Sequence, residues 1–181
     1  MIEIQELQIE HYCGRAKNAL QNHLIHKLLY PKVYFDADWD GGKLDVLAID
    51  RAGSGDVHGV RLVLWEPGHT DDHGYSAYLE KVVAAAVTEF VGFRGHFRYI
   101  AVICTVPDKQ QWIPSKGLKN QCLAPDGVGR LGMLYVDVSE EDADVKVLLK
   151  AERFRSSKEI VELSDRFVAE HTANWEYREE L

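Results

Sequence analysis

The sequence has few of the residues that define several specialised protein classes. It contains three cysteines and five prolines in 181 residues, and no apolar run approaches the roughly 20 residues that span a membrane. Three cysteines cannot all pair within one chain, which argues against a disulfide framework. The chain also opens without a basic segment followed by an apolar run. We therefore expect no signal peptide, no membrane partner and a reducing, cytoplasmic location.

Positive charge is also scarce. Asp and Glu number 29 against 21 for Lys and Arg, which gives a formal net charge of −8. Non-specific affinity for nucleic acid comes largely from Lys and Arg side chains that displace counterions. The composition therefore disfavours a protein whose main task is to wrap phosphate backbone, although it is compatible with a local basic patch.

The apolar content is sufficient for one core. Hydrophobic residues make up 46% of the chain and aromatic residues 10%, and the sequence shows neither an internal repeat nor a low-complexity segment. A chain of this length is typical of one compact domain. We expect a single α/β domain over residues 1–181.

Apolar periodicity predicts the order of elements. Spacings of three and four residues predict helices over about 9–29 and 79–90, and a third helix opened by a Ser156-x-x-Glu159 capping box and continuing toward Trp175. Alternating or continuous apolar runs predict strands over 33–39, 44–49, 57–65, 98–106, 131–138 and 145–151. The prediction is a mixed sheet of about six strands flanked by helices, in the order α-β-β-β-α-β-β-β-α.

The first three strands read as a meander. In the first strand, Val33, Phe35, Ala37 and Trp39 alternate with Tyr34, Asp36 and Asp38, which predicts one apolar and one acidic face. Asp40-Gly41-Gly42 has the composition of a tight hairpin turn, and Asp45 then stands at the start of the second strand. An acid inside a largely apolar strand requires either a hydrogen-bond partner or a metal ion.

This order, with an acid opening the second strand and a glycine-rich turn before the third, resembles the PD-(D/E)xK nuclease-like (restriction-endonuclease-like) superfamily over residues 5–106. The resemblance implies that the second core strand brings an Asp and the third a Glu-x-Lys. Two carboxylates on adjacent strands form a hard oxygen site that suits Mg²⁺ or Mn²⁺, which activates water, and the lysine stabilises developing negative charge.

Asp45 matches the first position of this pattern, and the third strand departs from it. Arg61 stands where the acid is expected and Val63 where the lysine is expected. Either the activity has been lost or other acids replace the missing one. The candidates are Asp56 and Glu66, which flank the gap together with His58, and Glu6 or Glu10 of the first helix, because the family often uses an acid from that helix.

Asp45 also has a purely structural interpretation. A strand-end carboxylate can accept a hydrogen bond from a backbone amide or pair with Arg61, and such a pair would explain an arginine in place of an acid. The sequence does not decide between this arrangement and a vestigial metal site.

Two further segments have candidate ligands. His69, Asp71 and His73 place two imidazoles and a carboxylate in five residues, a set that suits Zn²⁺, but the same polar stretch is equally typical of a loop that caps the next helix. The long connection 107–129 carries Trp112 and several lysines, which fits either single-strand binding or an ordinary surface loop.

Three functional hypotheses follow. The first is a nuclease-like protein that lacks the acid-x-lysine pair and acts by binding a partner protein or nucleic acid. The second is an active nuclease that uses Mg²⁺ or Mn²⁺, with Asp45 working together with Asp56, Glu66 or Glu10. The third is an α/β protein that binds a metal or small ligand through His69 and His73.

Overall fold

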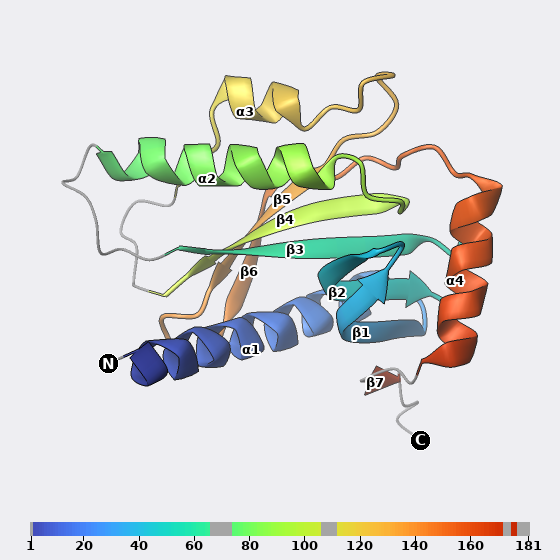
Figure 1. The fold of residues 1–181 in the computed structure, drawn as a ribbon, viewed down its shortest axis with the longest axis horizontal. Helices are drawn as coiled ribbons and strands as arrows, with labels where there is room; N and C mark the ends of the chain where they lie inside the picture. Colours follow the sequence, from blue (N-terminus) through green and yellow to red (C-terminus); the bar gives the residue numbers. More distant parts are fainter. Residues whose placement is uncertain (1, 66–73, 106–111, 172–174, 177–181) are drawn as a thin grey trace.

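The computed structural model describes residues 2–65, 74–105, 112–171 and 175–176 (Figure 1). The helices are α1 (Ile2–Lys27), α2 (Gly74–Phe90), α3 (Lys116–Gln121) and α4 (Lys158–Glu170). The strands are β1 (Pro31–Trp39), β2 (Gly42–Asp50), β3 (Val57–Trp65), β4 (Phe97–Cys104), β5 (Gly132–Asp137), β6 (Asp144–Leu149) and the two-residue β7 (Trp175–Glu176). The predicted α/β class and element order are confirmed, with α3 and β7 as additions. None of the described helices is long and apolar enough to cross a membrane.

All strands belong to one mixed sheet with the order β6-β5-β4-β3-β2-β1-β7. β1, β2 and β3 form an antiparallel meander, and β4 pairs parallel to β3 after the α2 crossover, as the continuous apolar run of β4 predicted. β5 is parallel to β4, and β6 is antiparallel to β5. The turn between β1 and β2 is the expected tight hairpin: Asp40 and Gly41 both have positive φ, and Trp39 pairs with Gly42.

Helices cover both faces of the sheet (Figure 1). On the face here called the α1 face, Ala16, Leu20 and Leu24 of α1 pack on side chains such as Val46 and Ala101. On the opposite face, here called the α2 face, apolar residues of α2, α3 and α4 pack on residues such as Leu47 and Ile100. The interior strands pack against helices on both faces of the sheet, which explains the continuous apolar run over residues 100–104 of β4.

Three local predictions were wrong. α1 begins at Ile2, seven residues before the expected start. The N-cap of α4 is Ser157, whose hydroxyl accepts the Ile160 amide at 3.3 Å, rather than Ser156. Helix α4 ends at Glu170, and Trp175 lies in β7. Ser156, the residue before the cap, bonds to another side chain, described below.

Candidate functional site

The Asp45 carboxylate is bonded to the backbone of the neighbouring strand. Its Oδ2 accepts the amide hydrogen of Leu62 at 2.7 Å. The ladder between β2 and β3 ends at the pair Val46 and Val60, so Leu62 lies just beyond the last paired residue. The side chain therefore satisfies an amide at the point where the two strands separate, which is the structural interpretation that the sequence left open.

The strands β1 and β2 are irregular at the same point. In β1, Val33 and Phe35 pack on the α1 face, but Ala37 and Trp39 pack on the α2 face. Asp36 lies between them with φ of +50° and is missing from the ladder. The predicted single apolar face of this strand was therefore wrong, because the alternation of faces reverses at a residue in the left-handed conformation.

The same reversal occurs on the partner strand. Leu44 packs on the α2 face, whereas Val46, two residues later, packs on the α1 face. Asp45 is the residue between them. The register is the same on both sides, with Phe35 opposite Val46 and Ala37 opposite Leu44, so neither strand carries an inserted residue.

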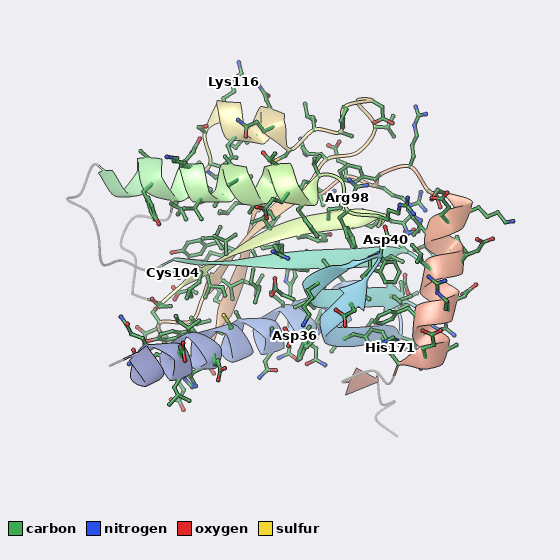
Figure 2. All side chains as sticks on the ribbon, in the orientation of Figure 1. Asp36, Asp40, Arg98, Cys104, Lys116 and His171 are labelled. Carbon is green, nitrogen blue, oxygen red and sulfur yellow. The ribbon has the colours of Figure 1, made fainter. Side chains whose placement is uncertain are left out.

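Helix α1 brings a lysine to this irregularity. The Lys17 ammonium contacts both carboxylate oxygens of Asp36, at 2.7 and 2.8 Å, and Figure 2 shows Asp36 beside α1. The half-buried Cys13 lies one turn before Lys17. Burial raises the pKa of the Cys13 thiol, Lys17 lowers it, and Asp45 and Asp36 raise it further. These four groups, here called the Asp45 cluster, thus act on one another electrostatically.

The third strand supplies neither an acid nor a lysine to the Asp45 cluster. Arg61 does not pair with Asp45; its Nη1 donates instead to the carbonyl of Lys43 at 2.9 Å. Val63, where the family pattern expects a lysine, is only 8% exposed and packs in the α2-face core. Among the residues that the structure describes, no group of three His, Cys, Asp or Glu side chains is arranged to hold a metal ion.

The other candidate acids are dispersed. Glu10 is exposed on α1, one turn before Cys13. Asp56 lies six residues before Leu62, which corresponds to about 20 Å of extended strand, so it and Asp45 stand at opposite ends of β3. Glu66, His69, Asp71 and His73 lie outside the described residues, and their proposed roles stay predictions.

Trp112 does not provide a stacking surface. It is 4% exposed and packs in the core of the α2 face. Lys116 and Lys119 belong to the short helix α3 that follows it. The aromatic residue that made this connection a candidate for holding single-stranded nucleic acid is therefore part of the core.

A partly buried polar network, which sequence spacing did not predict, lies at the other end of β3. The Arg153 guanidinium donates to Oδ1 of Asp56 through Nε at 3.0 Å and Nη2 at 2.7 Å. His96 lies beside this pair, with its Nδ1 3.5 Å from the same oxygen, and its Nε2 is 2.9 Å from the hydroxyl of Ser156. Although burial raises the pKa of Asp56, bonds to Arg153 and Ser54 outweigh it and the net shift is downward.

Ser156, His96 and Asp56 follow the order of a nucleophile, a base and an orienting acid, but the hydrogens are wrongly placed for that chemistry. The Val57 amide donates to Nδ1 of His96 at 3.0 Å, so Nδ1 carries no hydrogen for Asp56. The hydrogen is then on Nε2, which donates to Ser156 instead of accepting its proton. Burial also lowers the pKa of His96, which favours this neutral form. An activated serine needs the opposite tautomer.

Sequence spacing offered little signal for either arrangement. Arg153 is 97 residues from Asp56, and Ser156 is 60 residues from His96. Lys17 is 19 residues from Asp36 and reaches it from α1, a helix that the apolar spacing predicted. An excess of polar residues at both ends of β3 was the one readable indication.

Comparisons with known proteins show limited likeness. No protein-family model matches the sequence, and a search of curated proteins finds no match. Among solved structures, SPO1766, a protein of unknown function from Silicibacter pomeroyi, is similar at a TM-score of 0.44 with 14% identity, over 88% of this chain and 82% of that chain. SfsA from Pyrococcus furiosus, solved in complex with Ca²⁺, is similar at a TM-score of 0.34 with 14% identity, over 76% of this chain and 60% of that one. This alignment thus spans less than two thirds of SfsA, and at these scores neither likeness carries an argument about family or function.

Proposed function

We propose that this chain is a nuclease-like α/β scaffold that acts by binding a partner protein and does not cleave phosphodiesters by the acid-x-lysine route. One observation carries the proposal: the Asp45 carboxylate, which would open a metal site, accepts the Leu62 amide at 2.7 Å. A carboxylate used in this way closes a gap in the sheet, and its role is accounted for without a cation.

The neighbouring positions support the same conclusion. A hydrolytic Mg²⁺ site needs a second carboxylate close to the first, and a cation that stabilises the developing charge. Arg61 extends to the carbonyl of Lys43, and Val63 is buried in an apolar core. Neither side chain supplies an oxygen ligand.

The charge of the chain favours a protein over a nucleic acid as the partner. The formal net charge is −8, and the lysine nearest to Asp45 on α1 is neutralised by Asp36. A phosphate backbone would meet overall repulsion and would gain few released counterions. A partner protein has no such requirement for positive charge.

Cleavage assays test this proposal directly. Supercoiled and single-stranded DNA are incubated with millimolar Mn²⁺ and either the wild-type protein or Asp45→Asn, with Asp38→Asn as the matched control on the exposed part of β1. We expect the three proteins to be equally inactive. Manganese-dependent cleavage that disappears in Asp45→Asn and persists in Asp38→Asn would overturn the proposal.

A second candidate function is favoured by the Lys17 contact. In this version, Asp36 and Asp45 supply carboxylates and Lys17 of α1 replaces the missing lysine, since all three groups belong to the Asp45 cluster. It predicts cleavage that depends on Mn²⁺ and is lost in Lys17→Met as well as in Asp45→Asn. Loss in Asp45→Asn alone would instead point to acids such as Glu10 or Glu66.

A further inference from the structure

A cavity of about 360 Å³ lies at the end of the sheet opposite Asp45. One wall is the turn after β2, with Arg51, Ser54 and Gly55, and the other is the side of α4 that carries Val161, Ser164 and Asp165. Ile49, Asp50, His96, Arg153 and Ser156 also line it. A volume of this size is within the usual range for small-molecule sites.

Charges of both signs line the cavity, and two of them are unpaired. The Arg51 guanidinium and the Asp165 carboxylate make no hydrogen bond or ion pair with any other residue in the described part of the chain, and they do not pair with each other. Arg153 binds Asp56 through Nε and Nη2, which leaves its Nη1 available. Asp50 accepts the amides of Gly53 and Ser54, one on each oxygen, and a carboxylate has capacity for further donors.

A hydroxyl in the cavity wall also makes no hydrogen bond within the described part of the chain. Ser164 is 6% exposed and lines the cavity, and its hydroxyl forms no hydrogen bond with the residues that the structure describes. A serine within a helix commonly bonds the carbonyl one turn earlier, or water. The Ser164 oxygen is accessible from the cavity, so it can bond a polar ligand there.

Ser156 provides a second hydroxyl with a free hydrogen. Its oxygen accepts Nε2–H of His96, because Nδ1 of that ring is occupied by the Val57 amide. The Ser156 hydrogen is therefore not needed by His96 and can be donated to a ligand. Ser156 also stands directly before Ser157, the N-cap of α4, where the helix dipole favours a negative group.

We propose that this cavity binds a small zwitterion of the amino-acid class, with its carboxylate held by Arg51 and Ser156 and its ammonium held by Asp165 and Asp50. Arg51 is the unpaired cation of the lining and Asp50 and Asp165 are its carboxylates, since the charge of Arg153 is already met by Asp56. A ligand with charge of one sign leaves either Arg51 or the two carboxylates without a partner. The Ser164 hydroxyl supplies a further polar contact from the wall. This site is separate from the Asp45 cluster, and it does not depend on the proposed function.

Isothermal titration calorimetry at neutral pH with the full chain tests the proposal. The probes are the standard L-amino acids, together with glycine, β-alanine and 4-aminobutyrate, which place ammonium and carboxylate progressively further apart. Acetate, methylammonium and inorganic phosphate serve as single-charge probes. We expect saturable binding of at least one zwitterion and none of the single-charge probes, because each of those leaves an opposite charge of the cavity unmet.

Substitutions that remove one charge or one hydroxyl of the lining assign the contacts. We expect Arg51→Gln and Asp165→Asn each to weaken the zwitterion at least about tenfold, which corresponds to the loss of one charge-assisted hydrogen bond, and Ser164→Ala to weaken it by a smaller factor. Arg155→Gln and Glu162→Gln are matched controls, because both residues are exposed near or on α4 and neither lines the cavity. Absence of zwitterion binding, binding of phosphate alone, or equal weakening by the controls would overturn the proposal.

Discussion

The two ends of β3 use aspartate in opposite ways. At one end, here called the Asp45 end, the carboxylates of Asp45 and Asp36 bond to a backbone amide and to a lysine that comes from α1. At the other, the Asp56 end, a buried carboxylate is held by Arg153 beside His96. The bonds of Asp45 and Asp36 lie at an irregularity of the sheet, whereas the bonds of Asp56 join segments far apart in sequence.

This difference has an energetic consequence. At the Asp45 end the Asp36 side chain is 65% exposed and Asp45 bonds one backbone amide, so each change there should have a limited cost. At the Asp56 end, Asp56, His58 and His96 are all buried, and changes in charge there are poorly compensated by water. Stability should therefore depend more strongly on charge at the Asp56 end.

The largest expected effect is an acid sensitivity centred on His58. This ring is 6% exposed, stacks on Phe97 with centroids 4.6 Å apart, and has no partner for its buried Nδ1 among the described residues. Burial lowers its pKa to about 4. Above pH 6.5 the ring is neutral in both the folded and the unfolded chain. Between pH 6.5 and 4 only the unfolded chain takes up the proton, so the free energy of unfolding falls. Below pH 4 this loss of stability is complete. The loss of stability due to His58 should reach about 3 kcal/mol.

Urea unfolding of the wild type and of His58→Leu, measured from pH 7 to pH 4, isolates this contribution. Burial also lowers the pKa of His23 and His96, which adds loss in the same direction to both proteins. The difference between the two proteins should grow as the pH falls, with His58→Leu the more stable at pH 4. The exposed His11→Gln should follow the wild type. Parallel curves for wild type and His58→Leu would contradict the assignment.

The second effect concerns the ion pair at the same end. Arg153→Met leaves the Asp56 carboxylate, which is 9% exposed, without its guanidinium. Removal of one partner of a buried pair costs several kcal/mol, but the Arg153 side chain is 46% exposed, so we expect about 2 kcal/mol at neutral pH. The lowered pKa of Asp56 means that this contribution is present at neutral pH and is lost as the pH falls through that pKa.

Denaturant melts at neutral pH measure this loss. Arg155→Met is the matched control, since Arg155 is 71% exposed and pairs with the exposed Asp126, and it should cost less than about 0.5 kcal/mol. Equal effects of the two substitutions would remove the contrast between a buried and a surface pair on which the comparison depends.

At the Asp45 end, two substitutions of Asp45 should differ in their cost to stability. Asp45→Ala leaves the Leu62 amide without its acceptor and should cost about 1 to 2 kcal/mol. Asp45→Asn retains an oxygen that can accept the same hydrogen, so it should cost clearly less. Thermal or urea unfolding in the presence of EDTA checks this, because the order must hold without any metal. If Asn is as damaging as Ala, the negative charge matters more than the hydrogen bond.

The order of elements was predictable because each depends on local pattern. The spacing of Leu20 and Leu24, the Asp40-Gly41 turn and the apolar run of β4 each specify their element without help from distant residues. The same locality explains the success of the parallel β3–β4 pairing, since a helix between two strands favours a crossover.

The site was less predictable because its determinants are not local. The reversal at Asp36 is a single left-handed residue, and its lysine partner comes from α1. Asp45 was identified, but the choice between amide and metal depended on where β2 and β3 separate. The N-cap of α4 is one residue later than predicted, and Ser156 bonds instead to His96, 60 residues away. No spacing rule connects such pairs.

The smallest expected effect tests the reversal itself. Lys17→Met removes the ammonium from Asp36, whose side chain is 65% exposed, and should cost less than about 1 kcal/mol. Asp36→Gly removes the same ion pair but also relieves the φ of +50°, so it should be nearly neutral. Asp36→Ala loses the pair and keeps the strain, and it should therefore be less stable than Asp36→Gly by about 1 kcal/mol.

The order of the three variants in urea unfolding decides whether the backbone conformation or the ion pair maintains the reversal at Asp36. If the left-handed conformation persists in each variant, stability should decrease in the order Asp36→Gly, Lys17→Met, Asp36→Ala. Lys17→Met comes before Asp36→Ala because it retains an aspartate that tolerates positive φ. If Ala equals or exceeds Gly, the strand has straightened without Asp36, and the alternation of β1 should return to the pattern read from its sequence. Ala37 and Trp39 would then face α1, and the Trp39 indole would lose its bond to the carbonyl of Arg94, a change visible in tryptophan fluorescence.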